Sequence, residues 1–352
     1  MKVSKRELAF LAVASAADLG LVWGYFSARV YIDPLLLFAV SLVILGWLIT
    51  RSSEVCVETL VDFAEVTGSP PYVAGVISSL ASNLPEIALI AAALTSKEPE
   101  VVEVAVLAVM ISVGTSILLV SATTFAGAIK RGLKAIEVPK EALTDELNAV
   151  AFTLTAYLAL ALVSMARLFT GHSDHLPRGV GVILVLSYAS YILTLASRAE
   201  RREAKRGEAV KPLLVAIMGT IPILVSAEVL VRLVEELVTL RGFDVIHAAT
   251  AIAIVGTVPE HGVAIVSASK GEIEVGLGNT LSSVTTLALL AVGIVGIVVP
   301  IPLDDYVVAQ LGVTAASTLL LKFSIRDDGK IDVGEAVFMI ALQALAFDLL
   351  LT

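Results

Sequence analysis

The sequence has little charge, a single cysteine and few histidines. Asp, Glu, Lys and Arg make up 16% of its 352 residues, whereas 57% are hydrophobic. A soluble protein of this length would expose more charge to water. The single cysteine, Cys56, excludes an internal disulfide and a thiolate metal cluster. The four histidines do not gather with it in one apolar stretch, which argues against a soft-metal centre.

Catalytic signatures are missing as well. The chain contains no Gly-x-Ser-x-Gly, no His-Glu-x-x-His and no paired-aspartate arrangement. An intramembrane protease or lipid hydrolase is therefore disfavoured, and we expect neither enzyme activity nor a cofactor. The net charge of −9 says little about partners, because the acidic residues lie partly inside apolar stretches, and no nucleic-acid partner is expected.

Long apolar runs are what the sequence does have. They are about 20 residues long, which is the length that crosses a bilayer as a helix, and they are continuous rather than alternating. The sequence therefore predicts an all-α polytopic membrane protein. Dividing it at charged and Pro/Gly clusters gives about eleven transmembrane helices, at 8–28, 34–52, 72–95, 101–128, 145–168, 178–198, 212–240, 246–269, 274–300, 305–322 and 333–352.

Two of these boundaries carry further expectations. The first span resembles a signal peptide in its basic start, but its apolar run continues to Val30, so we expect it to be retained. The second span should continue as an amphipathic helix through Glu65.

Basic residues predict the orientation of these spans. Most of the 24 lysines and arginines fall on the side that holds the N-terminus. The positive-inside rule then places the N-terminus in the cytoplasm and the C-terminus outside, with a plasma membrane as the simplest location. The charged stretch 198–211 reads as a cytoplasmic linker.

An internal repeat relates the two parts of the chain. An offset of 174 residues aligns Ser52 with Ser226, Glu54 with Glu228, Asp62 with Glu236, Gly68 with Gly242, Pro85 with Pro259 and Glu86 with Glu260. Past the glutamates the offset becomes 171, and it aligns Ser112 with Ser283 and Thr115 with Thr286.

The repeat predicts two halves of opposite orientation. Glu86 lies on the third span and Glu260 on the eighth, five spans further along, and an odd offset gives equivalent spans opposite orientations, as in inverted-repeat transporters. The predicted plan is one extra N-terminal helix (1–33), a first five-helix repeat (34–197), the linker (198–211) and a second five-helix repeat (212–352).

Each repeat carries a Pro-Glu motif within an apolar stretch, Leu84-Pro85-Glu86 and Val258-Pro259-Glu260. A carboxylate in a bilayer core costs several kcal/mol unless it is paired, so it marks a functional site. Proline removes a backbone donor and is expected to kink or break the helix, and the freed carbonyls should face protein or water. Carboxylates, hydroxyls and carbonyls are hard oxygen ligands that suit Ca²⁺.

Hydroxyl-rich patches follow each glutamate one span later, at 112–116 and 278–286. They can complete a coordination shell, although small residues also serve close helix packing. Two carboxylates in one site would repel without a cation, so protons can neutralise the empty pair and couple to Ca²⁺.

The residues around the second motif resemble the Ca²⁺:cation antiporter superfamily, in particular its cation/proton exchanger branch. The likeness is carried by GTVPEHG, by Lys270-Gly271, by SSVTTLAL and by the last segment, DDGKIDVGEAVFMIALQALAFDLL. The resemblance implies a secondary active antiporter that moves Ca²⁺, as substrate, in exchange for H⁺ by alternating access. The predicted cation-binding set is Glu86, Glu260, Asn83, Thr257, Ser112, Ser116, Asn279 and Ser283, with Thr115, Thr286, His261, Glu54 and Glu228 as secondary candidates.

Some positions depart from the sodium/calcium branch of that superfamily. Ser116 stands where asparagine is common, Leu287 stands where an acid or amide is frequent, and Ala81-Ser82-Asn83 replaces Gly-Thr-Ser. A cation site with fewer charged ligands than that branch has should bind several Na⁺ ions less well, which favours protons over Na⁺ as the counter-ion. A Na⁺/Ca²⁺ exchanger remains the alternative, followed by a cation channel, and neither the transported cation nor the oligomeric state follows from the sequence.

Overall fold

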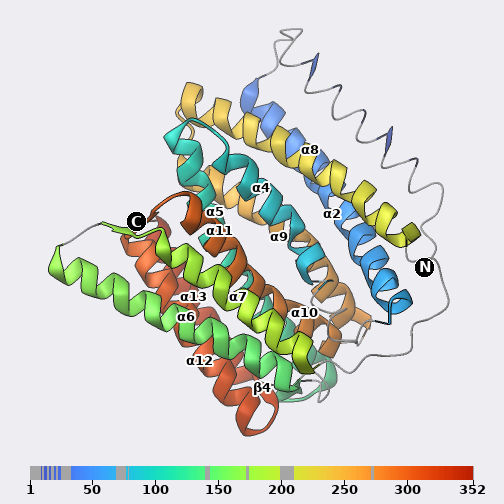
Figure 1. The fold of residues 1–352 in the computed structure, drawn as a ribbon, viewed down its shortest axis with the longest axis vertical. Coiled ribbons are helices and arrows are strands. Elements are labelled where there is room, and N and C mark those ends of the chain that lie inside the picture. Colours follow the sequence, from blue (N-terminus) through green and yellow to red (C-terminus); the bar gives the residue numbers. More distant parts are fainter. Residues whose placement is uncertain are drawn as a thin grey trace. The chain divides into compact units, whose positions relative to one another are not determined.

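The structure is a computed structural model that describes residues 33–68, 79–138, 143–171, 174–198, 210–270 and 273–351, with Ile77 and isolated positions before 33. The predicted first span and most of the linker lie outside the described residues. Within the described ranges the chain is almost entirely helical (Figure 1), and seven helices are long and apolar enough to cross a membrane. The prediction of an all-α polytopic membrane protein is confirmed.

The helices follow the predicted spans closely. In the first half they are α2 (Pro34–Val66), α4 (Leu84–Leu94), α5 (Pro99–Arg131), α6 (Leu143–Thr170) and α7 (Gly179–Arg198). In the second half they are α8 (Val210–Arg241), α9 (Val245–Lys270), α10 (Ile273–Thr285), α11 (Val292–Val298), α12 (Asp305–Asp327) and α13 (Val333–Leu351). The predicted extension of the second span through Glu65 is confirmed by α2, whereas the total of eleven spans stays a prediction.

The chain divides into two compact units, each of which takes segments from both sequence halves. One comprises Met1–Ala108 and Glu200–Pro259, and the other comprises Val109–Ala199 and Glu260–Thr352. We call them unit 1 and unit 2. The predicted division of the chain into two repeats at the linker 198–211 is a different division from these compact units, and it stays a prediction.

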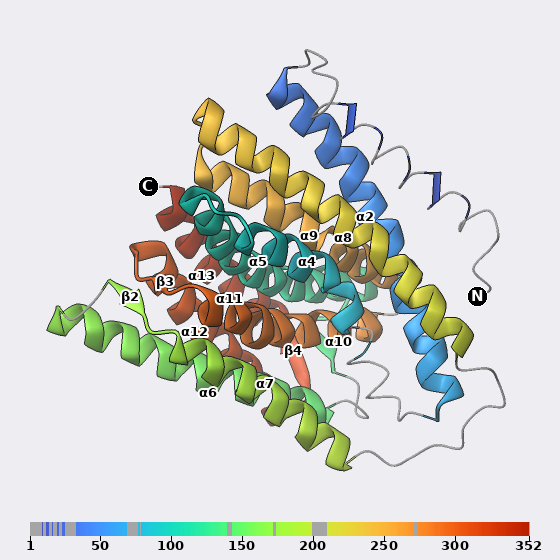
Figure 2. The same cartoon turned by 45° about the horizontal axis from the view of Figure 1, so that its top comes forward.

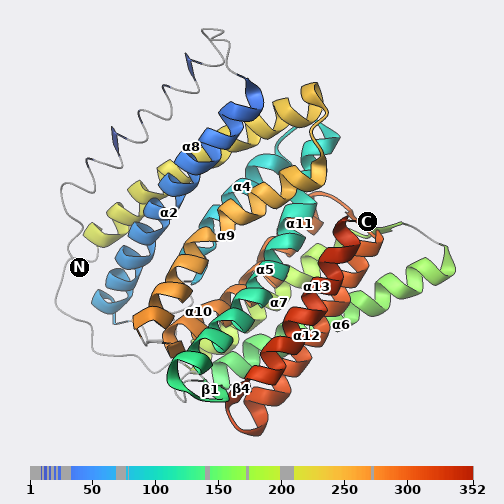
Figure 3. The same ribbon diagram turned by 180° about the vertical axis from the view of Figure 1, so that it is seen from behind.

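In unit 1, α2 and α8 lie side by side and antiparallel (Figures 1 and 3). Each exceeds 30 residues, or about 45 Å, which is longer than a bilayer core requires. Their backbones approach at Gly219, where a Cβ atom would lie 2.9 Å from the Cys56 sulfur. The Cys56 thiol in turn donates to the Ala216 carbonyl at 3.3 Å. A small residue therefore sets the α2–α8 contact, as is usual between membrane helices.

Two repeat-matched glycines end these two helices. Gly68 follows α2 with φ of 70°, and Gly242 follows α8 with φ of 66°. The left-handed conformation at a helix C-terminus is easy only for glycine. At these two positions the sequence repeat is therefore also a repeat of backbone conformation.

In unit 2, α6 packs against α12, α7 against α11, and α13 against α12. Two short antiparallel sheets join the loops between these helices. β1 (Ala135–Glu137) pairs with β4 (Lys330–Asp332), and β2 (His175–Leu176) pairs with β3 (Ile301–Pro302) (Figures 2 and 3). The central residues Ile136 and Ile331 are fully buried.

The two sheets are equivalent under the predicted repeat. β1 follows α5 as β3 follows α11, and β2 follows α6 as β4 follows α12. Each sheet thus pairs a loop of the first half with the non-equivalent loop of the second half. This exchange of partners is what a two-fold relation between inverted halves produces.

Candidate functional site

The first Pro-Glu motif begins a helix. Residues 79–82 are helical, Asn83 forms a turn, and α4 starts at Leu84 with Pro85 in its first turn, where the missing N–H costs nothing. Glu86 also lies in this first turn and is 2% exposed. The partial positive charge of a helix N-terminus stabilises a carboxylate at this position. The predicted helix break at the first motif is confirmed.

Polar groups of unit 1 satisfy the backbone at this break. The Ser79 carbonyl accepts from the Asn83 backbone N–H at 3.0 Å and from the Asn83 side-chain amide at 2.7 Å. The Ala81 carbonyl accepts from the Ser53 hydroxyl of α2 at 3.2 Å. Protein groups, not lipid, therefore take these two carbonyls, as the sequence predicted. Asn83 itself is fully buried.

Glu86 packs against α9 at a glycine that the sequence analysis did not single out. A Cβ atom on Gly256 would lie 2.7 Å from Glu86 Cγ and 3.3 Å from Glu86 Cα. Only glycine allows this approach. The neighbouring candidate, Thr257, is buried and donates its hydroxyl to the Ile254 carbonyl at 3.2 Å. A small residue next to the motif was the signal that could have identified Gly256.

The second motif lies within a helix, not at its start. α9 runs without interruption from Val245 to Lys270 and includes Pro259. The predicted break is therefore absent at this motif, whereas the alternative, a kink, stays a prediction. The helix starts 14 residues before Pro259, so helix surrounds this proline on both sides and the loss of one backbone N–H does not end it.

Glu260 is completely buried in unit 2, where the Ser116 hydroxyl of α5 donates to its Oε2 at 3.2 Å. Its Oε1 has no hydrogen-bond partner within the described part of the chain. A buried carboxylate oxygen that lacks a donor is costly unless a cation or a proton takes its place. Ser116 is thus the predicted hydroxyl that the structure brings directly to a motif glutamate.

The other predicted ligands of unit 2 differ in burial. Ser112 and Ser283 are buried, Asn279 is partly buried, and the Asn279 amide nitrogen has no hydrogen-bond partner among the described residues. The secondary candidates Thr115 and Thr286 donate to carbonyls of their own helices, those of Ser112 and Ser282, at 2.9 and 3.0 Å.

The remaining secondary candidates are placed differently. His261 lies in α9, but its side chain is outside the described part of the structure. Glu54 pairs with Arg51 on α2, and Glu228 accepts from Arg232 on α8 at 2.8 Å. Both glutamate side chains are more than a third exposed, at 39% and 48%. They form exposed ion pairs along their own helices and not parts of a buried shell.

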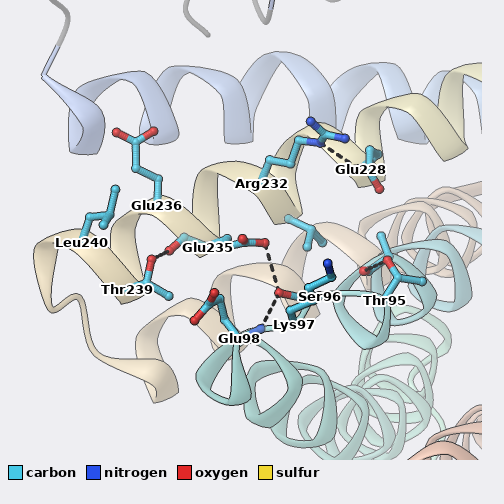
Figure 4. Close-up of a pocket in the computed structure, with 12 residues that line it drawn as sticks. Thr95, Ser96, Lys97, Glu98, Glu228, Arg232, Glu235, Glu236, Thr239 and Leu240 are labelled. Atoms are coloured by element: carbon cyan, nitrogen blue, oxygen red, sulfur yellow. Dashed lines mark hydrogen bonds and ion pairs between the residues drawn. The ribbon is translucent and has the colours of Figure 1, made fainter.

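Glu228 also lines an open pocket of unit 1, about 770 Å³ in volume, between the end of α4, the loop before α5 and α8 (Figure 4). The Ser96 hydroxyl, in the loop before α5, donates to Glu235 Oε2 of α8 at 3.1 Å and so links two sides of this pocket. Among the described residues no three His, Cys, Asp or Glu side chains come together as a metal site. The pocket therefore gathers carboxylates and the basic groups of Lys97 and Arg232 without forming a metal shell.

A π-helical segment, η1 (Thr286–Ala291), continues α10 into α11. The Tyr157 hydroxyl donates to the Ala288 carbonyl at 3.0 Å, and the Tyr188 and Thr286 hydroxyls lie 3.4 Å apart. π-Helical turns occur preferentially at functional sites. Hydropathy does not distinguish a π-turn from an α-turn, so this segment could not be predicted from the sequence.

The profile of the sodium/calcium exchanger protein family matches residues 35–196 and 211–346. This is most of the chain. The chain belongs to the sodium/calcium exchanger protein family. The predicted superfamily is thereby confirmed, and the family is one that is named for exchangers.

The chain is also similar to a protein named as a cation/proton exchanger. The vacuolar cation/proton exchanger 1c of Oryza sativa subsp. japonica is 24% identical over 287 residues, which cover 73% of this chain. The match spans 63% of the length of the rice protein.

Several solved structures share the fold. The crystal structure of the H⁺/Ca²⁺ exchanger CAX gives a TM-score of 0.72 at 20% identity and covers 99% of this chain and 89% of that one. Native YfkE gives 0.67 at 17% identity, covering 97% and 100%. The sodium-calcium exchanger NCX_Mj, soaked with 10 mM Na⁺ and 10 mM Sr²⁺, gives 0.63 at 20% identity, covering 89% and 98%.

Proposed function

We propose that this family member is a secondary active antiporter that exchanges Ca²⁺ for H⁺ by alternating access. The observation that carries the proposal is the buried carboxylate of Glu260, which has one oxygen near the Ser116 hydroxyl and the other without a donor in the described part of the chain. Such a group favours a cation or a proton as its partner. Ca²⁺ and H⁺ are the two ions that this exchange requires.

In the proposed site both motif glutamates are ligands of the transported cation. Glu86 is as inaccessible to solvent as Glu260, with exposures of 2% and 0%. Hard oxygen ligands of this kind suit Ca²⁺. Hydroxyl and amide oxygens are proposed to complete the shell, from Asn83, Thr257, Ser112, Ser116, Asn279 and Ser283.

Coupling follows from competition for the same carboxylates. Ca²⁺ binds when they are deprotonated, and protons neutralise them when Ca²⁺ has left. The protein changes the side from which the site is accessible only when the site holds either Ca²⁺ or protons. It does not do so when the site is empty, because a pair of unpaired buried charges is the least stable arrangement. No additional group is needed for coupling.

Protons are the proposed counter-ion because the site is poor in charged ligands. Leu287 is fully buried at the position where sodium/calcium exchangers often carry an acid or amide. The rice relative is named as a cation/proton exchanger and one matching structure as an H⁺/Ca²⁺ exchanger. Na⁺/Ca²⁺ exchange is the second candidate, favoured by the family name and the likeness to NCX_Mj.

We also propose a plasma membrane location with the N-terminus in the cytoplasm and the C-terminus outside. The distribution of lysine and arginine supports this orientation. The rice relative is named as vacuolar, so an organelle membrane is the competing location.

The test is uptake of ⁴⁵Ca²⁺ into proteoliposomes under an outward proton gradient and, separately, under an outward Na⁺ gradient. Uptake driven by protons alone is expected. Uptake driven by Na⁺ would replace the proton by Na⁺ in the proposal. Flux that needs no opposing gradient would indicate a channel, and a folded protein without coupled uptake would refute Ca²⁺ antiport. Collapsing each gradient with an ionophore is the matched control.

A further inference from the structure

Unit 2 contains a reciprocal pair of buried amides that the proposed function does not use. The Gln343 side chain of α13 donates to Gln310 Oε1 of α12 at 2.7 Å, and Gln310 donates back to Gln343 Oε1 at 3.2 Å. Gln310 also donates to the Thr314 hydroxyl at 3.3 Å. Both glutamines are fully buried.

Gln343 is an isolated polar group in its helix. Every residue of α13 between Glu335 and Asp348 is apolar except Gln343. The side chains of Phe338 and Leu345 on the same helix are 55% and 59% exposed on its outer surface. Lipid offers an amide no hydrogen-bond partner, so the pair fixes the rotation of α13 about its own axis against α12.

The pair also contacts α5, the helix that carries the predicted hydroxyl ligands. Gln343 lies directly on Gly114, where a Cβ atom would clash with its amide nitrogen and would lie 2.9 Å from its Cδ. The same Cβ atom would lie 3.0 Å from Phe347 Cζ. The backbone of α5 can approach α13 this closely only because residue 114 has no side chain.

Gly114 stands between two predicted ligands, Ser112 and Ser116. Ser116 is the residue that donates to Glu260. A continuous series of contacts therefore leads from Gln310 through Gln343 and Gly114 to the hydroxyl at the proposed site. Every member of the series belongs to unit 2.

We propose that the Gln310–Gln343 pair is a positioning element for cation binding. It sets the approach of α5 to α13 and thereby holds the Ser116 hydroxyl where it meets the Glu260 carboxylate. Neither glutamine touches the cation. The inference rests on the proposed Ca²⁺ transport, but it concerns residues that the motif chemistry leaves out.

The test separates positioning from simple stabilisation with three variants, Gln310→Met, Gln343→Met and the double variant. Each single variant leaves one buried amide without its partner and should unfold at a lower temperature. The double variant removes both amides and should recover most of that loss. If the pair positions Ser116, KM for Ca²⁺ in proteoliposomes stays raised by at least about fivefold in the double variant, with a smaller change in maximal rate.

The matched control is Thr318→Val. Thr318 is also buried on α12, but its hydroxyl donates only within its own helix, to the carbonyls of Thr314 and Ala315 at 2.7 and 3.1 Å. Its KM for Ca²⁺ should equal that of the wild type. A double glutamine variant with both stability and KM restored would overturn the proposal, because the pair would then serve stability alone.

Gly114→Ala provides an independent variant in case the double variant does not fold. It pushes the Gln343 amide away from α5 while keeping both glutamines, and it should raise KM in the same way. An unchanged KM would overturn the inference. Measuring whether Ca²⁺ raises the unfolding temperature separates a failure of the proposed function from a failure of this inference. A wild type that neither transports Ca²⁺ nor is stabilised by it refutes both. Normal wild-type transport with unaffected variants refutes the inference alone.

Discussion

The two Pro-Glu motifs are almost identical in sequence but occupy different backbone environments. Leu84-Pro85-Glu86 begins α4 directly after the turn at Asn83, whereas Val258-Pro259-Glu260 lies deep within α9. The helix N-terminus stabilises the negative charge of Glu86, while Glu260 receives a hydroxyl donor from Ser116. The comparison shows that two motifs of nearly the same sequence can both bury a carboxylate while different groups support it.

Removing either carboxylate should have the largest effect. Glu86→Gln and Glu260→Gln are each expected to reduce coupled Ca²⁺ uptake on the order of 100-fold or more, because a charged ligand of a buried site is lost. Uptake of ⁴⁵Ca²⁺ into proteoliposomes measures this. Glu100→Gln, an exposed acid in the first turn of α5, should transport normally. Normal uptake by either motif variant would remove that glutamate from the site.

The two prolines should respond differently to replacement by alanine. In Pro259→Ala, residue 259 regains an N–H that can bond to the Val255 carbonyl within α9, which should stabilise the protein by up to about 3 kcal/mol. Pro85→Ala should change stability by only a few tenths of a kcal/mol, roughly, because the first turn of a helix does not use that N–H. Thermal unfolding in detergent compares the two. Equal shifts would contradict the difference in backbone described here.

A smaller effect than that of Pro259→Ala is expected at the start of α9, where Asp244 accepts from the backbone N–H of His247 at 3.0 Å. This hydrogen bond, and a second contact with the His247 ring, hold the pKa of Asp244 below its usual value. A lowered pKa stabilises the fold above the unfolded-state pKa of about 3.9, and the stabilisation is lost as pH falls through the lower, folded-state value.

Asp244→Ala should therefore cost about 0.5–1 kcal/mol near neutral pH and progressively less in acid. Unfolding temperatures measured between pH 7 and pH 3 would show the difference closing. Asn83→Ala tests the start of α4, where the Asn83 side chain makes no cap bond to the helix and does not titrate. Its effect should be independent of pH. A constant cost for Asp244→Ala across the range would exclude the carboxylate as its source.

The sequence was sufficient for the all-α polytopic fold, for the extension of α2 through Glu65 and for the burial of both motif glutamates. Apolar length and basic flanks are imposed by the bilayer itself, so they can be read without tertiary information. The turn after α12 contains Gly329, which adopts a φ of 73°.

The difference between the two motifs could not be predicted from the tripeptide. One local signal was available, the residue three positions before each glutamate. Asn83 uses its amide to close a turn on the Ser79 carbonyl, whereas Thr257 remains helical and donates to Ile254. Asparagine favours such turns and threonine tolerates a helix by bonding back to it.

Other features depend on contacts far apart in the chain. Gln310 and Gln343 are separated by 33 residues, and nothing around either one indicates the other. Tyr157 and the π-helical Ala288 carbonyl are 131 residues apart. Such pairs become visible only when helices are packed, because no periodicity along one helix encodes its partner.

The exchanged strands have a consequence for how the protein is made. After β1 has been synthesised, about 195 further residues must be added before its partner β4 is complete. For β2 and its partner β3 the interval is about 125 residues. At a synthesis rate of roughly 5–20 residues per second, these delays amount to about 6–40 s. The first half of unit 2 must therefore persist in the membrane with unpaired strand edges until the second half arrives. Synthesised as separate polypeptides, the two halves should recognise each other at both ends through these strands.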